Sequence, residues 1–108
     1  MLKLTAGDAL RRLAETKTDF ARLIEKDSFD VSLYKPEKID PQTPHARDEL
    51  YVIASGSGKF LCDGETESVA TGDVLLVAAG AQHRFENFTD DFSTWVIFLG
   101  NRPGKPAH

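Results

Sequence analysis

Two short segments of the sequence carry residue types that bind divalent metal ions. His45 and Glu49 stand four positions apart in the first segment, and His83 follows His45 by thirty-eight positions in the second. Two imidazoles and one carboxylate on one face of an ion form the arrangement associated with non-haem Fe(II) chemistry. We therefore take these three residues as a candidate site for one divalent transition metal, with Fe, Zn, Mn or Ni as the ion.

The strand pattern around these residues predicts that they face a common interior. Side chains of a strand alternate between its two faces, so Glu49 shares a face with Tyr51, and His83 shares one with Phe85 and Asn87. The aromatic neighbours indicate an apolar interior. A carboxylate in such a place is costly unless it is paired or bound to a cation, which favours a metal ion beside Glu49.

Each candidate ligand also has an interpretation without a metal. His45 follows a proline-rich loop and could be solvated, and His83 could be a hydrogen-bonded residue at the mouth of a barrel. Arg47 could form a salt bridge with Glu49 with no metal present. Taken as a set at this spacing, the three residues favour metal binding.

The rest of the pattern predicts an all-β domain with a short N-terminal helix. Residues 8–15 place alanine and leucine on one stripe and charged residues opposite, as in an amphipathic helix. Short strand-like segments separated by turns follow, and Asp63-Gly64 is the clearest hairpin signal. These segments lie at 20–25, 29–35, 49–54, 59–62, 65–69, 74–77, 83–87 and 94–99. Such regular short strands favour an antiparallel sandwich or barrel.

The length of 108 residues predicts one domain. We expect a helical segment at 1–18, a barrel at 19–99 and a flexible, Gly/Pro-rich tail at 100–108. Residues 74–77 and 94–99 are apolar on both strand faces. The outer face therefore has to be covered by the N-terminal segment or by a second subunit, and we predict a homodimer.

The composition narrows the class of partner. The formal net charge is −4, and basic residues are scattered rather than gathered with aromatics, which disfavours nucleic-acid binding. No apolar run approaches the roughly 18 residues that a membrane span needs. The N-terminal residues do not form the apolar core of a secretion signal, and the single Cys62 allows no internal disulfide. We predict a cytoplasmic protein that binds a small molecule, without nucleic-acid or membrane partners.

The first segment resembles the first motif of the cupin family. That motif contains H-x-H, three or four residues, a glutamate, six residues and a glycine. Glu49 and Gly56 fit this spacing, and His45 stands where the second histidine belongs. Thr43, or Gln42 with the longer spacing, occupies the position of the first histidine.

The second segment resembles the second cupin motif at every spacing. Gly72, Gly80, His83 and Asn87 match its glycines, histidine and asparagine, and Ala78 replaces its proline. The resemblance implies a small single-domain bacterial cupin with an RmlC-like jelly-roll barrel. Because the first histidine is replaced, it implies a four-ligand site cut to three protein ligands.

The resemblance also implies metal-dependent chemistry on a small molecule, of dioxygenase, isomerase or lyase type. Tyr51, Phe85 and Gln42 are the residues we expect near the substrate. The sequence shows no evident general base, so whether the protein is an enzyme stays undecided. The alternatives are a non-catalytic cupin that binds a small molecule or a metal, and a metal-free structural cupin.

Overall fold

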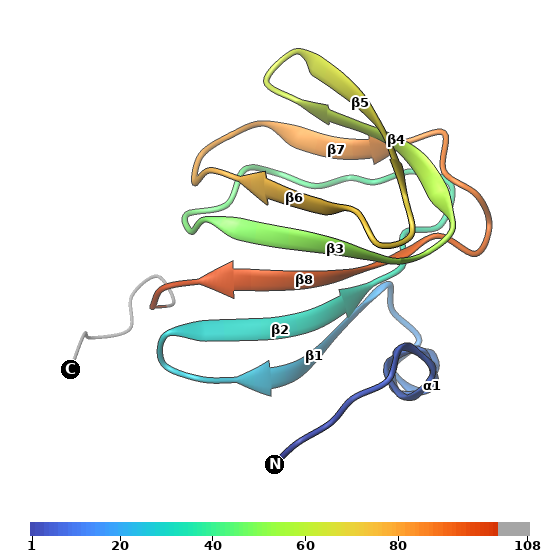
Figure 1. The fold of residues 1–108 in the computed structure, drawn as a ribbon, viewed down its shortest axis with the longest axis vertical. Coiled ribbons are helices and arrows are strands. Elements are labelled where there is room, and N and C mark those ends of the chain that lie inside the picture. The colour runs from blue at the N-terminus through green and yellow to red at the C-terminus, as the bar shows by residue number, and fades with distance from the viewer. Residues whose placement is uncertain (102–108) are drawn as a thin grey trace.

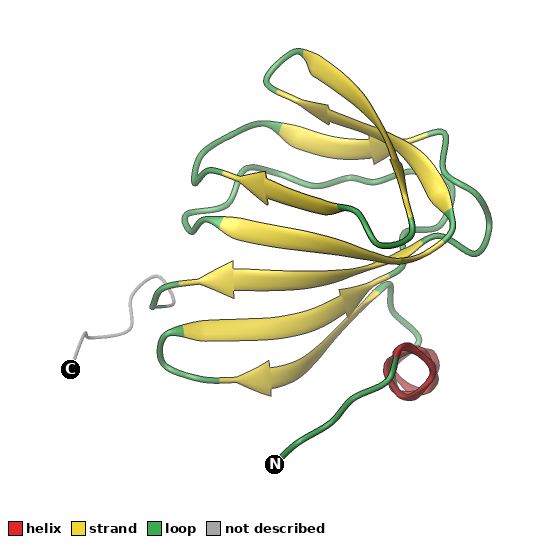
Figure 2. Cartoon of the chain, in the orientation of Figure 1, coloured by secondary structure: helices red, strands yellow, loops and turns green. Residues whose placement is uncertain are grey.

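A computed structural model describes residues 1–101, which form one helix and eight strands (Figure 2). The elements are α1 (Ala6–Thr16), β1 (Phe20–Glu25), β2 (Phe29–Tyr34), β3 (Glu49–Ser55), β4 (Ser57–Cys62), β5 (Glu65–Ala70), β6 (Val74–Val77), β7 (His83–Glu86) and β8 (Ser93–Leu99). The predicted all-β class with a short N-terminal helix is confirmed. The expected tail at 100–108 lies outside the described residues from 102 onward.

The strands form two antiparallel sheets, as a cupin jelly roll requires (Figure 1). The larger sheet has the order β1-β2-β8-β3-β6, and the smaller has the order β5-β4-β7. One hydrophobic core joins them, because Tyr51 and Val96 of the larger sheet pack in the same cluster as Phe60 and Phe85 of the smaller sheet. Two of the candidate ligands, Glu49 and His83, stand at the start of strands that belong to different sheets.

Helix α1 covers part of the outer face of the larger sheet. Its N-terminus has a capping box, in which the Asp8 amide donates to Thr5 Oγ1 (3.0 Å) and the Thr5 amide donates to Asp8 Oδ2 (3.3 Å). Leu13 is buried in a second apolar cluster that includes Leu33 of β2. The cap explains why the helix begins two residues before the predicted start. Among residues 1–101, no helix has the length and apolar character that crossing a membrane requires.

Alternation along β3 and β7 places Glu49 and His83 inside the barrel, as predicted. Glu49 and Tyr51 are buried on β3, and His83 and Phe85 are buried on β7. The prediction for Asn87 is wrong. Strand β7 ends at Glu86, and Asn87 is an exposed residue in the left-handed conformation (φ 50°), so it does not share the inward face of His83.

Gly56 links the two sheets where β3 passes into β4. Its φ of 75° lies in the left-handed region, and a Cβ there would come within 2.8 Å of the Phe92 Cα. Both the backbone conformation and the close approach of the chain require glycine. The first motif therefore ends at a glycine that the fold itself requires, independently of any ligand that the protein binds.

Candidate metal centre

The structure brings His45, Glu49 and His83 together at one end of the barrel. His45 lies on the loop before β3, Glu49 begins β3, and His83 begins β7. One ligand atom of each lies within 4.8 Å of the others. Glu49 Oε1 is 2.8 Å from His83 Nε2 and 3.8 Å from His45 Nε2. All three side chains can reach a common ion.

The carboxylate of Glu49 is the strongest sign that a cation belongs here. Its side chain is 1% exposed, and neither oxygen has a donor in hydrogen-bond geometry. The expected alternative partner points elsewhere, because Arg47 contacts Asp30 Oδ2 at 3.0 Å. A buried carboxylate without hydrogen bonds is costly, and a bound cation would offset that cost. The residues present fit a metal ion.

His83 is oriented to present one ring nitrogen to the site. Its Nδ1 lies 2.9 Å from the Ala81 carbonyl oxygen, which only accepts, so Nδ1 carries a proton and Nε2 faces Glu49. Burial lowers the pKa of His83, but the Glu49 carboxylate and the Ala81 carbonyl raise it more, and the net pKa lies above the ordinary 6.5. A metal ion would therefore compete with a proton for Nε2.

The side-chain oxygen of Gln42 is a fourth atom that could coordinate a metal ion. Its Oε1 lies 3.3 Å from Nε2 of both His45 and His83 and accepts a hydrogen bond from the Tyr51 hydroxyl at 2.8 Å. Burial and the charge of Glu49 raise the pKa of Tyr51, so its hydroxyl keeps the proton that it donates. The site thus combines two imidazole nitrogens, a carboxylate and an amide oxygen. The longer motif spacing, which puts Gln42 at the position of the first histidine, matches this placement.

Asp40 fixes the orientation of the Gln42 amide. Its carboxylate accepts from Gln42 Nε2 at 2.7 Å, from the Tyr34 hydroxyl at 2.5 Å and from the Phe85 amide at 2.8 Å. Because the carboxylate accepts these bonds, the amide nitrogen faces Asp40 and the amide oxygen faces the two imidazoles. Sequence reasoning missed Asp40, since the loop that carries it has no periodicity to mark an inward-facing residue.

The two aromatic residues expected near the substrate lie deep in the core. Tyr51 is 0% exposed and Phe85 1%, and their ring centroids are 5.0 Å apart. Tyr51 reaches the site through its hydroxyl alone. The substrate contacts of Tyr51, Phe85 and Gln42 stay predictions.

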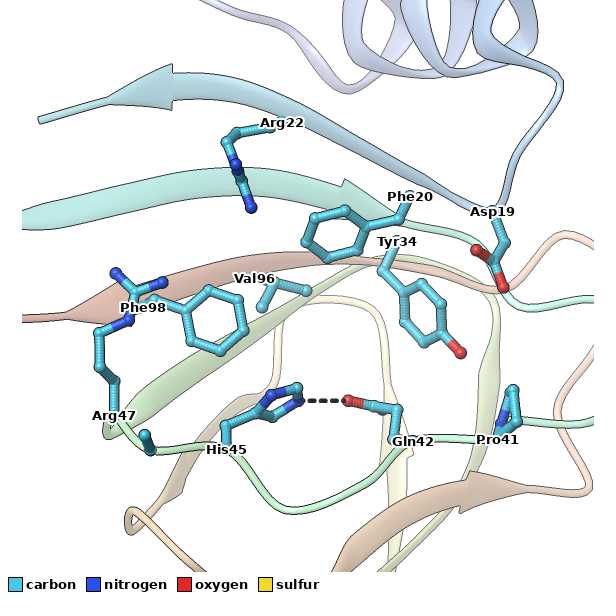
Figure 3. Close-up of a pocket in the computed structure, with 11 residues that line it drawn as sticks. Asp19, Phe20, Arg22, Tyr34, Pro41, Gln42, His45, Arg47, Val96 and Phe98 are labelled. Carbon is cyan, nitrogen blue, oxygen red and sulfur yellow. Dashed lines mark hydrogen bonds between the residues drawn. The ribbon is translucent and has the colours of Figure 1, made fainter. Parts of the chain in front are cut away.

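A cavity of about 480 Å³ adjoins the site on the side of the large sheet (Figure 3). Gln42 and His45 form its boundary with the metal centre, and Figure 3 shows them joined by the hydrogen bond described above. The rest of the wall is mainly apolar and includes Phe20, Tyr34, Pro41, Val96 and Phe98. A compact molecule in this cavity would lie next to the candidate ligands.

Comparison with known families decides the assignment of the chain. The cupin domain model matches residues 31–98, which include both motifs and all four donor residues. The chain belongs to the cupin family. The resemblance seen in the two motifs is thereby confirmed, and so is the jelly-roll fold that it implied.

Two curated relatives and one solved structure show how this cupin compares with others. It is 33% identical to the uncharacterized protein SCO3923 of Streptomyces coelicolor, over 73% of this chain and 77% of that one. It is 32% identical to the HTH-type transcriptional activator RhaS of Mannheimia succiniciproducens, over 65% of this chain but 26% of that protein. A cupin superfamily protein from Desulfitobacterium hafniense has a similar fold, with a TM-score of 0.64, 22% identity and coverage of 76% of each chain.

Proposed function

We propose that this cupin binds one divalent transition metal and carries out metal-dependent chemistry on a small molecule held in the adjoining cavity. His45, Glu49 and His83 are the ligands, and Gln42 Oε1 is the fourth donor. The observation that carries the proposal is the Glu49 carboxylate, buried between two imidazoles without a hydrogen bond. We infer that Gln42 binds the metal ion. This role would accompany or replace the contact with the substrate that the sequence predicts for Gln42.

The donor set indicates what kind of ion and chemistry the site suits. Two nitrogen and two oxygen donors accept several first-row ions, so supply and geometry decide among Fe, Mn, Zn and Ni. An ion bound there would supply Lewis-acid chemistry, as in isomerases and lyases, or oxygen chemistry if it is Fe(II). The protein's own residues orient the donors and keep them in an apolar surrounding. Asp40 holds Gln42, and the Ala81 carbonyl holds His83.

Metal titration of tag-free protein tests the proposal. Protein stripped with a chelator is titrated with Mn²⁺ and with Zn²⁺ by calorimetry, and bound metal is measured by elemental analysis. We expect about one equivalent per chain, and His83→Ala should weaken binding on the order of 100-fold or more, since even residues that only orient ligands matter 10–100-fold. His108→Ala is the matched control, because His108 is the third histidine of the chain. Equal metal content in wild type and His83→Ala would overturn the proposal.

A second candidate function is a non-catalytic barrel that binds a small molecule. The similarity to RhaS favours it, because the matched part is 26% of a transcriptional activator rather than an enzyme. The two functions share the site and differ in turnover. Stoichiometric uptake of a small molecule by metal-loaded protein, with no product formed, would favour the binding module.

We also propose that the protein is a homodimer that packs through the outer face of the large sheet. Val74 and Leu76 on the edge strand β6 are 62% and 69% exposed, and they pair with the half-buried Val52 and Leu50 of β3. Helix α1 lies against the other end of this face (Figure 1). Light scattering should give twice the chain mass for wild type and a lower mass for Leu76→Lys. A monomeric wild type at micromolar concentration would contradict the proposal.

A further inference from the structure

Two arginines line the cavity that adjoins the metal centre, although the wall is otherwise mainly apolar. Arg22 comes from β1, and Arg47 comes from the loop between His45 and β3. Figure 3 shows both guanidinium groups at the same end of the cavity, while Asp19 lies at the opposite end near the Tyr34 hydroxyl. Guanidinium groups facing an apolar cavity are suited to hold an anionic group of a ligand.

Arg47 is held rigidly and keeps an unused donor. Its side chain is 13% exposed, its guanidinium carbon lies 4.7 Å from the Phe98 ring centroid, and its Nη2 contacts Asp30 Oδ2 at 3.0 Å. Its Nη1 is buried and makes no hydrogen bond. A buried donor without an acceptor is unfavourable, and a small shift of the guanidinium toward the cavity would let a ligand oxygen satisfy it.

The same arginine is connected to the metal centre through one aromatic ring. Phe98 stacks under Arg47 and makes an edge contact with His45, with ring centroids 5.0 Å apart. If the anionic group of a ligand binds at Arg47, the rest of that ligand would lie beside Phe98 and extend toward His45. This geometry fixes both ends of a compact ligand.

Arg22 supplies the more exposed of the two positive charges. Its side chain is 45% exposed, and its ion pair with Glu25 is long, at 3.4 Å. Such an exposed pair contributes little, so the guanidinium can turn to a ligand at small cost. Asp30 and Glu25 partly balance the charges of Arg47 and Arg22, which favours a monoanion over a dianionic phosphate.

We propose that the cavity binds a compact, partly apolar carboxylate, with the carboxylate at Arg47 and Arg22 and the apolar body against the wall that Phe98 and His45 form. This inference rests on the proposed function, since it names the substrate class of the same site. Asp19 is negatively charged and lies at the opposite end of the cavity (Figure 3), so the anionic group is expected at the arginine end. The arginines act as specificity-determining residues, and the metal ligands act on the part of the molecule that reaches His45.

Benzoate, benzamide and phenyl phosphate are suitable probes because they share one ring and differ in charge. Binding is followed by NMR titration of metal-free protein and of Zn²⁺-loaded protein. We expect both forms to prefer benzoate over benzamide by about tenfold or more, with phenyl phosphate binding no more tightly than benzoate. Equal affinity for benzoate and benzamide, or tighter binding of phenyl phosphate, would overturn the carboxylate assignment.

Arginine variants locate the anion. Arg22→Gln leaves a half-exposed position and should weaken benzoate binding about three- to tenfold, without changing benzamide binding. Arg47→Met should weaken benzoate binding more, and its thermal unfolding is recorded to show that it folds. The matched control is Arg11→Gln, since Arg11 is also exposed and paired with a residue three positions away, Asp8. Wild-type affinity for benzoate in Arg22→Gln and in folded Arg47→Met would refute the inference.

The outcome separates this inference from the proposed function. Protein that binds no metal but keeps its preference for benzoate refutes the metal site and leaves the carboxylate cavity standing. Protein that binds metal yet takes benzoate and benzamide equally refutes the carboxylate cavity and leaves the metal site standing.

Discussion

Asp40 and Glu49 are both carboxylates enclosed by the barrel, and their surroundings differ sharply. Asp40 is 7% exposed and accepts three hydrogen bonds, from Tyr34, Gln42 and Phe85. Glu49 is 1% exposed and accepts none, and its nearest ionisable neighbours are His83 and His45.

This difference distinguishes a structural carboxylate from one that is suited to bind a cation. The charge of Asp40 is fully solvated by protein donors, so its role is to hold Gln42 and the loop in place. The groups nearest to the Glu49 carboxylate are the two candidate ligand histidines. The same barrel thus contains one carboxylate that protein donors satisfy and one whose neighbouring ionisable groups are the two candidate ligand histidines.

Replacing Glu49 by glutamine should produce the largest effect on metal binding. We expect Glu49→Gln to weaken Zn²⁺ or Mn²⁺ binding on the order of 100-fold or more, because a charged ligand is lost. The free energy of unfolding of the metal-free protein should change by less than about 1 kcal/mol, or rise, because a buried charge without hydrogen bonds is removed. Calorimetric titration and chemical denaturation measure the two quantities. If Glu49→Gln lowers the free energy of unfolding of the metal-free protein as much as it lowers the free energy of metal binding, then Glu49 is a structural residue.

Replacing Asp40 by asparagine should lower the stability of the metal-free protein more than Glu49→Gln does, and should weaken metal binding less. Asp40→Asn places an amide where three donors point, and we expect the metal-free protein to lose about 1–3 kcal/mol of stability. Metal binding should weaken about tenfold, because Gln42 loses its orientation. The same two measurements apply. Unchanged stability in Asp40→Asn would remove the distinction between the two carboxylates.

The pH should act in opposite directions on metal-free stability and on metal affinity. The folded-state pKa of His83 lies above its unfolded value of about 6.5, so its contribution to metal-free stability is complete below that pH and is lost as pH rises through the folded pKa. Metal affinity rises over the same window, because the ion displaces the proton. Melting temperatures with and without Zn²⁺, between about pH 5.5 and about pH 8.5, measure both trends. In metal-free His83→Gln, the melting temperature should depend less on pH than in the wild type. If the slope with pH is the same in both, a group other than His83 causes the pH dependence.

Removing a single oxygen atom from Tyr51 should have the smallest effect. Tyr51→Phe deletes the hydrogen bond to Gln42 Oε1 and keeps the packed ring. We expect metal binding to weaken by about 0.5–1.5 kcal/mol, equivalent to a few-fold change in the dissociation constant. A loss as large as that of Glu49→Gln would mean that Tyr51, rather than Gln42, completes the site.

The sequence predicts the strands and the inward direction of the ligands because these follow from local periodicity. Alternation from Glu49 and from His83 requires knowledge of only two or three neighbouring residues. The hairpin at Asp63-Gly64 is equally local, since both residues adopt the left-handed conformation that its turn needs, with φ values of 47° and 86°.

The roles of Asp40 and Gln42 could not be predicted in the same way. Both lie on an irregular loop, and their partners come from Tyr34, Tyr51 and Phe85, which meet only when the two sheets close. The error at Asn87 has a related cause, because periodicity does not show where a strand stops. The motif spacing placed Gln42 near the site, but only the hydrogen bonds show which atom of its amide faces the imidazoles.

The central claim is that one ion is shared by His45, Glu49, His83 and Gln42. Anomalous scattering from crystals of tag-free protein grown with Zn²⁺, recorded on both sides of the zinc absorption edge, tests it most directly. We predict one peak in each chain, about 2.0–2.2 Å from both imidazole Nε2 atoms and a Glu49 oxygen. A fully occupied zinc ion elsewhere on the chain, with no peak between these side chains, would contradict the account.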